Sequence, residues 1–137
     1  MPTDAEHRIK YEDNRRVLTA HNGLDQTSEC WAAVVAFYAS LHLVERLAAF
    51  EGKHLVRHVG PGSREMFLRY HSDHKAILGD YTALRRASEQ ARYESLERFQ
   101  ISFPPTTMRA KLIDGCLHRI ENHVFGFLPS IPPAAGS

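Results

Sequence analysis

The longest apolar stretch of the chain, 30–50, predicts a helix that other helices surround. At about 100° per residue its side chains fall on two opposite stripes. One stripe contains Trp31, Val34, Val35, Tyr38, His42 and Glu45, and the other contains Ala33, Phe37, Leu41, Val44, Leu47 and Ala48. Because both stripes carry large apolar residues, both faces of this helix have to be covered.

A membrane-spanning segment is the alternative for 30–50, since such segments also run apolar for about 20 residues. Ser40, His42, Glu45 and Arg46 interrupt the stretch, however, and no basic residue precedes it at 26–29. Charged groups are costly inside a bilayer. The sequence therefore favours the central helix of a soluble protein that has no membrane association.

Amphipathic patterns predict the other helices. The first covers about 4–21 and stops at Asn22-Gly23, and the second is a short stretch at 63–71 that Ser63 caps. A longer stretch runs from near 80 to Phe103-Pro104-Pro105, and a last stretch, which Thr106 or Thr107 caps, ends near 127. Gly60-Pro61-Gly62 interrupts any helix between the 30–50 stretch and the short stretch at 63–71. Since no stretch has the alternation of a strand, we predict an all-α up-and-down bundle of four long helices plus a short connecting helix.

Length and charge narrow the picture. The 137 residues are enough for one domain, which we place at 1–128, and the Pro- and Gly-rich stretch 129–137 is predicted to be a disordered tail. A net charge of +1 gives no overall basic surface of the kind that duplex-binding proteins show. The polar first residues and two cysteines within helical apolar patterns predict a cytoplasmic protein without disulfides.

Polar residues repeat at helical spacing on the 30–50 helix and on the helix that starts near 80. They are Tyr38, His42 and Glu45 on the first and Tyr81, Ser88 and Arg92 on the second. Buried polar groups need partners, so we predict a network between the two helices with an ion pair between Glu45 and Arg92. The alternative is a ligand pocket lined by Tyr38, His42 and Arg92.

The segment 53–74 concentrates the residues that suit acid–base or phosphate chemistry. They are His54, Arg57, His58, Arg64, Arg69, His71 and His74. Titratable side chains on an irregular connection are accessible to substrate, so this segment is the predicted functional site and its residues are expected at the surface. Solvated charges on a surface loop are the alternative.

Two Arg–His pairs could form such a site. Arg64 and His71 are seven residues apart and share a face of a continuous helix. Arg69 and His74 come together only if the chain bends at 72–73. Each pair would place an imidazole, which titrates near neutral pH, beside a guanidinium that binds phosphate.

His54 and His58 are four residues apart with Arg57 between them, a spacing that suits a bound phosphate or nucleotide. A metal ion would need a third ligand. No further residue has a spacing typical of one, so the sequence predicts no metal site and no other cofactor.

The pattern WAAVVAFYASLHLVERLAAFEGKHLVRH, followed later by YTALRRASEQARYE, resembles HEPN-domain proteins. The shared features are an aromatic and alanine-rich second helix, a Gly and His after it, and ARY toward the end of a later helix. The resemblance covers about 30–94. It implies a helical bundle that dimerises, with either a metal-independent ribonuclease of toxin or defence type or a non-catalytic module that binds nucleotides or partners.

The usual nuclease form has an Arg followed directly by Asn or another polar residue, and a His four to six residues later that is often followed by Tyr. This sequence departs from that form. The resemblance also implies an antitoxin or a nucleotidyltransferase as partner.

Metal-free RNA cleavage needs a base for the 2′-hydroxyl proton, an acid for the leaving oxygen and a cation for the phosphate. In this interpretation His71 or His74 is base and acid in turn, Arg64 or Arg69 holds the phosphate, and a symmetric dimer brings two copies to one cleft. A non-catalytic nucleotide- or RNA-binding module and a dimerisation scaffold are the two other function classes that the sequence leaves open.

Overall fold

The computed structural model describes residues 4–20, 26–53, 55 and 63–128. Within these ranges the chain is mostly helical and has no strand, which confirms the predicted all-α class. The elements in chain order are α1 (Asp4–Ala20), α2 (Gln26–Phe50), α3 (Arg64–Tyr70), the 3₁₀-helix η1 (Lys75–Ile77), α4 (Leu78–Tyr93), α5 (Leu96–Ser102), α6 (Pro105–Met108), the π-helix η2 (Arg109–Leu117) and α7 (His118–Phe127). The predicted tail, 129–137, lies outside the described residues.

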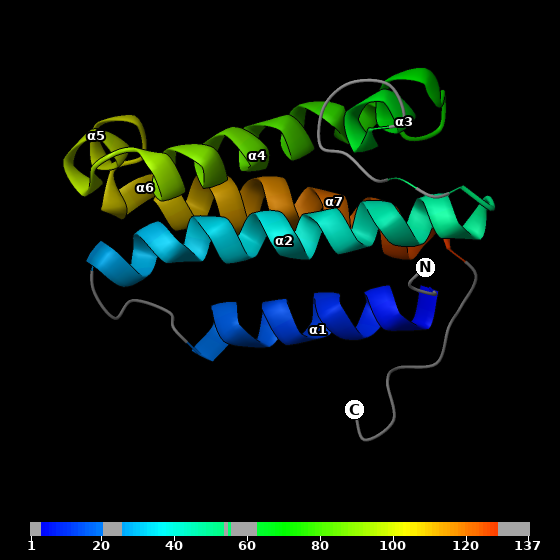
Figure 1. Cartoon of the computed structure of the whole chain (residues 1–137), viewed down its shortest axis with the longest axis horizontal. Helices are drawn as coiled ribbons and strands as arrows, with labels where there is room; N and C mark the ends of the chain where they lie inside the picture. The colour runs from blue at the N-terminus through cyan, green and yellow to red at the C-terminus, as the bar shows by residue number, and fades with distance from the viewer. Residues whose placement is uncertain (1–3, 21–25, 54, 56–62, 129–137) are drawn as a thin grey trace.

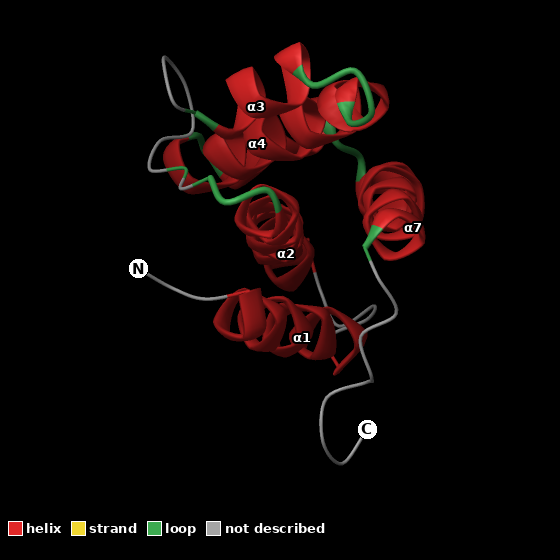
Figure 2. Ribbon diagram, turned by 90° about the vertical axis from the view of Figure 1, so that its right-hand side faces the viewer, coloured by secondary structure: helices red, strands yellow, loops and turns green. Residues whose placement is uncertain are grey.

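The central position predicted for 30–50 is confirmed, because α2 lies between α1 and α4 and contacts η2 and α7 as well (Figures 1 and 2). Ala33, Phe37, Leu43, Val44 and Leu47 on α2 are completely buried. By length and composition Trp31–Phe50 could cross a membrane, but 72% of this segment is buried within the protein. The other helices therefore cover most of its apolar surface, while Trp31 and Phe50 at its two ends are each 54% exposed.

Residues at the helix ends account for two of the element boundaries. The hydroxyl of Ser63 accepts a hydrogen bond from the backbone N–H of Met66 at 3.1 Å, which confirms the predicted cap of α3. Gly52 has a φ of +75°, a conformation that favours glycine, and its N–H donates to the carbonyl of Ala49 where α2 ends. The stop of α1 predicted at Asn22-Gly23 lies outside the described residues.

Two predicted boundaries are wrong. The helix that starts near 80 was expected to continue to 103, but α4 ends at Tyr93 because Ser95 adopts an extended conformation and caps α5 through the N–H of Arg98. The last helical stretch begins earlier than expected, with Pro105 in its first turn, where a missing N–H costs no hydrogen bond. Its cap residue is Pro104, and the hydroxyl of Thr107 donates to the Pro104 carbonyl.

A buried network of charges holds α1 and α3 against α2. The Arg64 guanidinium donates two hydrogen bonds to Glu45 Oε1, and His7 Nε2 lies 3.1 Å from Glu45 Oε2. The side chains of Arg64 and Glu45 are 10% and 11% exposed. The predicted ion pair between Glu45 and Arg92 is therefore wrong, and so is the expectation that Arg64 is a surface residue.

We expect Leu41→Asp to lower the free energy of unfolding by more than about 3 kcal/mol, because Leu41 is 5% exposed on the central helix and the new carboxylate would have no partner there. Ile101→Asp is the matched control, since Ile101 is 75% exposed on α5. Urea denaturation followed by circular dichroism measures both. Similar losses in the two variants would contradict the central position of α2.

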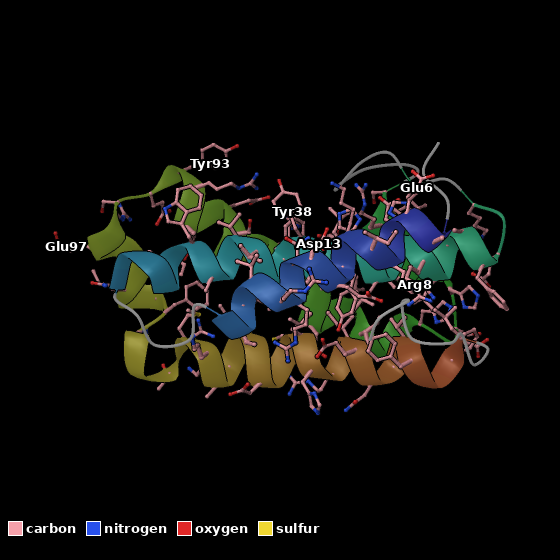
Figure 3. All side chains as sticks on the ribbon, turned by 90° about the horizontal axis from the view of Figure 1, so that it is seen from below. Glu6, Arg8, Asp13, Tyr38, Tyr93 and Glu97 are labelled. Carbon is pink, nitrogen blue, oxygen red and sulfur yellow. The ribbon has the colours of Figure 1, made fainter. Side chains whose placement is uncertain are left out.

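We expect Glu45→Ala to cost about 3 kcal/mol or more, because it leaves the buried Arg64 guanidinium and His7 without their acceptor. The double variant Glu45→Ala/Arg64→Ala should lose less than the sum of the two single losses. Asp13→Ala is the control, since its pair with Arg16 is largely exposed on the face of α1 shown in Figure 3 and should be worth less than about 1 kcal/mol. Additive losses would show that Glu45 and Arg64 are not coupled.

Candidate functional site

One end of the molecule brings a carboxylate and three histidines together from distant parts of the chain. Glu51 follows α2 directly, His71 is the residue at which α3 ends, His74 precedes η1, and His123 lies on α7. Their contacts link them as Glu51 to His71, His71 to His74, and His74 to His123. We call these four residues the Glu51–His123 cluster.

A tight turn after α3 sets the positions of two of the histidines. His71 leaves the helical conformation with φ −105° and ψ 109°, and its carbonyl accepts hydrogen bonds from the N–H groups of His74 and Lys75 at 2.9 and 3.0 Å. The imidazole rings of His71 and His74 consequently stack, with centroids 4.1 Å apart. The chain therefore does bend at 72–73, as a pair of Arg69 and His74 would require, and the bend stacks His74 on His71.

The hydrogen bonds of His71 indicate its tautomer. Its Nδ1 accepts from the backbone N–H of Asp73 at 3.2 Å, so this nitrogen is unprotonated. Its Nε2 then carries the proton and donates to Glu51 Oε1 at 2.5 Å. A carboxylate bound to one imidazole nitrogen orients the ring and makes the other nitrogen a better proton acceptor.

His74 is completely buried behind His71. Its Nδ1 lies 3.0 Å from His123 Nε2, and the ring of Phe127 lies edge-on to it with a centroid distance of 4.5 Å. Burial lowers the pKa of His74, and the neighbouring His71 and His123 lower it further. Burial also lowers the pKa of His123. Both imidazoles are therefore neutral at physiological pH.

A groove of about 260 Å³ opens beside His71. Its lining consists of Lys53, Leu55, Ser63, Met66, Phe67, Tyr70 and His71. The Lys53 ammonium lies over the Phe67 ring at 5.6 Å from its centroid, and Tyr70 is 75% exposed. A cation, an imidazole and the exposed ring of Tyr70 in one groove suit a ligand that has both a phosphate and a planar ring.

The structure separates the predicted catalytic residues into three groups. His71 and His74 lie together, but only His71 lines the groove. Arg69 is exposed in the last turn of α3. Arg64 is engaged with Glu45 in the buried network, so the cation expected to share a surface site with His71 is held elsewhere.

Of the predicted ligand-binding residues, Tyr38 and Arg92 do meet across α2 and α4, where Arg92 Nη1 donates to Tyr38 Oη at 3.4 Å. His42 faces α1 instead, with its Nδ1 3.0 Å from His7 Nδ1. The buried hydroxyls of Tyr81 and Ser88 have no hydrogen-bond partner within the described residues. The other three candidates, His54, Arg57 and His58, lie outside the described residues.

Sequence reasoning missed Glu51 and His123. Glu51 is an acidic residue at the end of a helix, and no motif around it marks it as functional. His123 lies 72 positions further along the chain. Only the packing of α7 beside η1 and α2 brings them near the turn at 71–75. No spacing in the sequence could have linked the two residues.

Comparison with protein-family models, with curated proteins and with solved structures found no match to this chain.

We expect the protein to lose stability in mild acid because of His42. Burial, together with the nearby His7, Lys10 and Arg64, lowers the pKa of His42 from its ordinary 6.5 to about 4. Between these two values the unfolded chain binds the proton and the folded chain does not, so stability is complete above pH 6.5 and falls as the pH drops toward 4. At about 1.4 kcal/mol per pKa unit the shift corresponds to roughly 3.5 kcal/mol, which solvent screening of the partly exposed ring reduces to roughly 2–3 kcal/mol.

Denaturant unfolding at pH 7 and at pH 4.5 measures this loss. In His42→Asn the difference between the two pH values should be smaller by about 1–2 kcal/mol, because asparagine does not titrate. If wild type and His42→Asn showed an equal pH dependence, His42 would be protonated at pH 4.5 in the folded protein as it is in the unfolded chain, and its pKa would not be lowered.

Proposed function

We propose that this protein is a HEPN-like, metal-independent endoribonuclease that acts as a symmetric dimer. The observation that carries the proposal is the His71 imidazole at the edge of the groove, with Glu51 bound to its Nε2 proton. This arrangement leaves Nδ1 of His71 as the proton acceptor. Nδ1 now accepts from the Asp73 N–H at 3.2 Å in an exposed contact, and the substrate hydroxyl has to replace that N–H. The antiparallel succession of α1, α2, α4 and the α6–α7 stretch is compatible with the HEPN-like bundle (Figure 1).

In the proposed reaction His71 removes the proton from a ribose 2′-hydroxyl. The 2′-oxygen attacks the adjacent phosphorus, the bond from phosphorus to the 5′-oxygen breaks, and a 2′,3′-cyclic phosphate forms. The leaving 5′-oxygen then needs a proton from an acid. His74 is too buried to supply it directly, so the donor is the His71 of a second copy across a two-fold axis, which starts the step protonated on both ring nitrogens.

Phosphate contacts are assigned to Lys53 and Arg69, which are both exposed. Lys53 lines the groove, and Arg69 lies two residues before His71. Arg64, which the sequence placed in this role, serves here as a positioning residue for α3 because its guanidinium is bound to Glu45.

A non-catalytic module that binds a nucleotide or RNA is the second candidate. It is favoured by the burial of His74, because His71 is then the one imidazole among the described residues that lines the groove. The groove would then hold a base against Phe67 or Tyr70 and a phosphate at Lys53. Such a module would respond to a nucleotide with a higher melting temperature and no turnover.

We expect wild-type protein to cleave mixed-sequence RNA in excess EDTA and His71→Asn to lower the rate by at least about 100-fold, the usual contribution of an acid–base residue. The amide oxygen of the new asparagine could still accept from the Asp73 N–H, so the turn should survive. Glu51→Gln should lower the rate less, since the imidazole remains. His118→Asn is the control, because His118 is an exposed histidine on α7.

Melting curves must show that all variants fold. Full activity in His71→Asn would place the reaction elsewhere. A wild type that gains melting temperature with nucleotides but releases no product would establish the binding module instead.

A further inference from the structure

We propose that Glu51, His71 and His74 form a binding site for a divalent ion of the zinc class. The site lies at the end of α2 and opens toward the groove through His71. It goes beyond the proposed ribonuclease activity, which uses no metal.

The first argument is geometric. One ligand atom from each of Glu51, His71 and His74 lies within 4.8 Å of the other two. His71 Nε2 is 2.5 Å from Glu51 Oε1, and His74 Nε2 is 4.0 Å from Glu51 Oε2. Ligand atoms around a tetrahedral zinc ion with bonds of about 2.1 Å lie roughly 3.4 Å apart, between these two distances. Side-chain movements of an ångström or so would close the site around an ion.

The second argument is an unsatisfied buried nitrogen. His74 is 0% exposed, and its Nε2 has no hydrogen-bond partner within the described residues. If His74 Nδ1 donates to His123, then Nε2 is a bare lone pair that faces the Glu51 carboxylate at 4.0 Å. If His123 donates instead, the Nε2 proton of His74 has no acceptor. When His74 carries its proton on Nδ1, a cation between Nε2 and the Glu51 carboxylate gives both of these groups a partner.

The surroundings match those of a metal-binding histidine. A ligating imidazole usually donates its other N–H to a further polar group, and His123 Nε2 is in place to accept from His74 Nδ1 at 3.0 Å. Phe67 and Phe127 pack on the His74 ring with centroid distances of 5.6 and 4.5 Å and fix its orientation.

The ligand chemistry selects the class of ion. Two imidazole nitrogens and one carboxylate oxygen suit zinc and its neighbours in the first transition row, whereas magnesium and calcium prefer oxygen ligands. Three protein ligands leave a fourth position for water on the groove side.

Metal binding would oppose the proposed cleavage. When an ion takes His71 Nε2, the proton of this ring moves to Nδ1, and the 3.2 Å contact with the Asp73 N–H is lost. A protonated Nδ1 cannot accept the proton of a ribose hydroxyl. Zinc should therefore inhibit the ribonuclease while binding tightly.

Tag-free full-length protein, stripped with EDTA and dialysed, is titrated with ZnCl₂ and with CoCl₂ at pH 7.5. We expect one ion per chain, the intense visible bands of tetrahedral cobalt, and a melting temperature that rises with free zinc. MgCl₂ at the same concentration should change neither the spectrum nor the melting temperature.

The variants assign the site. Glu51→Gln should weaken zinc binding by at least about 100-fold, and His123→Asn should weaken it by about tenfold through loss of the second hydrogen bond of His74. His118→Asn should bind as wild type does. Glu51 is largely outside the core, so Glu51→Gln tests the site even if variants of the buried His74 fail to fold.

Unchanged affinity in Glu51→Gln would overturn the proposal, and so would a cobalt spectrum without tetrahedral bands. Loss of binding in His54→Asn or His58→Asn, with Glu51→Gln unaffected, would place the ion elsewhere and overturn it as well. Binding and RNA cleavage are measured separately, so either proposal can fail alone. Cleavage that needs zinc would refute the metal-independent mechanism and leave the metal site standing.

Discussion

The carboxylate of Glu45 is the interaction on which the arrangement of three helices depends. It lies on α2 and binds Arg64 of α3 with one oxygen and His7 of α1 with the other. Burying a charge is costly unless partners surround it, so this carboxylate constrains where α1 and α3 can lie. Apolar packing alone gives α2 its covered position but leaves neighbouring helices free to slide or rotate. The contacts of Glu45 with Arg64 and His7 are directional and oppose such movement.

Much of the fold was predictable because the signals are local to each helix. The apolar stripes of 30–50 predict a central helix, and Ser63 predicts the start of α3, and the structure agrees in both cases. The break at Ser95 was missed because the apolar spacing alone does not reveal which serine caps a helix. The π-helix η2 was missed because its wider turn changes the backbone hydrogen bonds but leaves little trace in the spacing of apolar residues along the sequence. Gly115 fits there, since a Cβ would lie 3.1 Å from the carbonyl oxygen of Ala110.

The candidate site was predictable only in part. Spacing along one segment brought out His71 and His74, which do lie together. It could not identify Glu51 or His123, because their proximity comes from tertiary packing of α2 and α7 against the turn. The same limit explains the wrong partner for Glu45. Arg92 has the right angular position on α4, but Tyr38 reaches it there, while Arg64 and His7 occupy the carboxylate.

The seven-residue step from Arg64 to His71 connects the fold to the site. Arg64 begins α3 and His71 follows its last residue, and each contacts a carboxylate: Glu45 lies five residues before the end of α2, and Glu51 lies just beyond it. Glu45 holds Arg64, and Glu51, six positions later, holds His71. The face that Arg64 and His71 share therefore anchors α3 to α2 and also carries the imidazole of the site. Because the buried pair at Arg64 fixes the start of α3, it also fixes where α3 ends and so where the His71 imidazole meets Glu51. A substitution at Glu45 should disturb the site through the position of α3, although Glu45 itself does not line the groove.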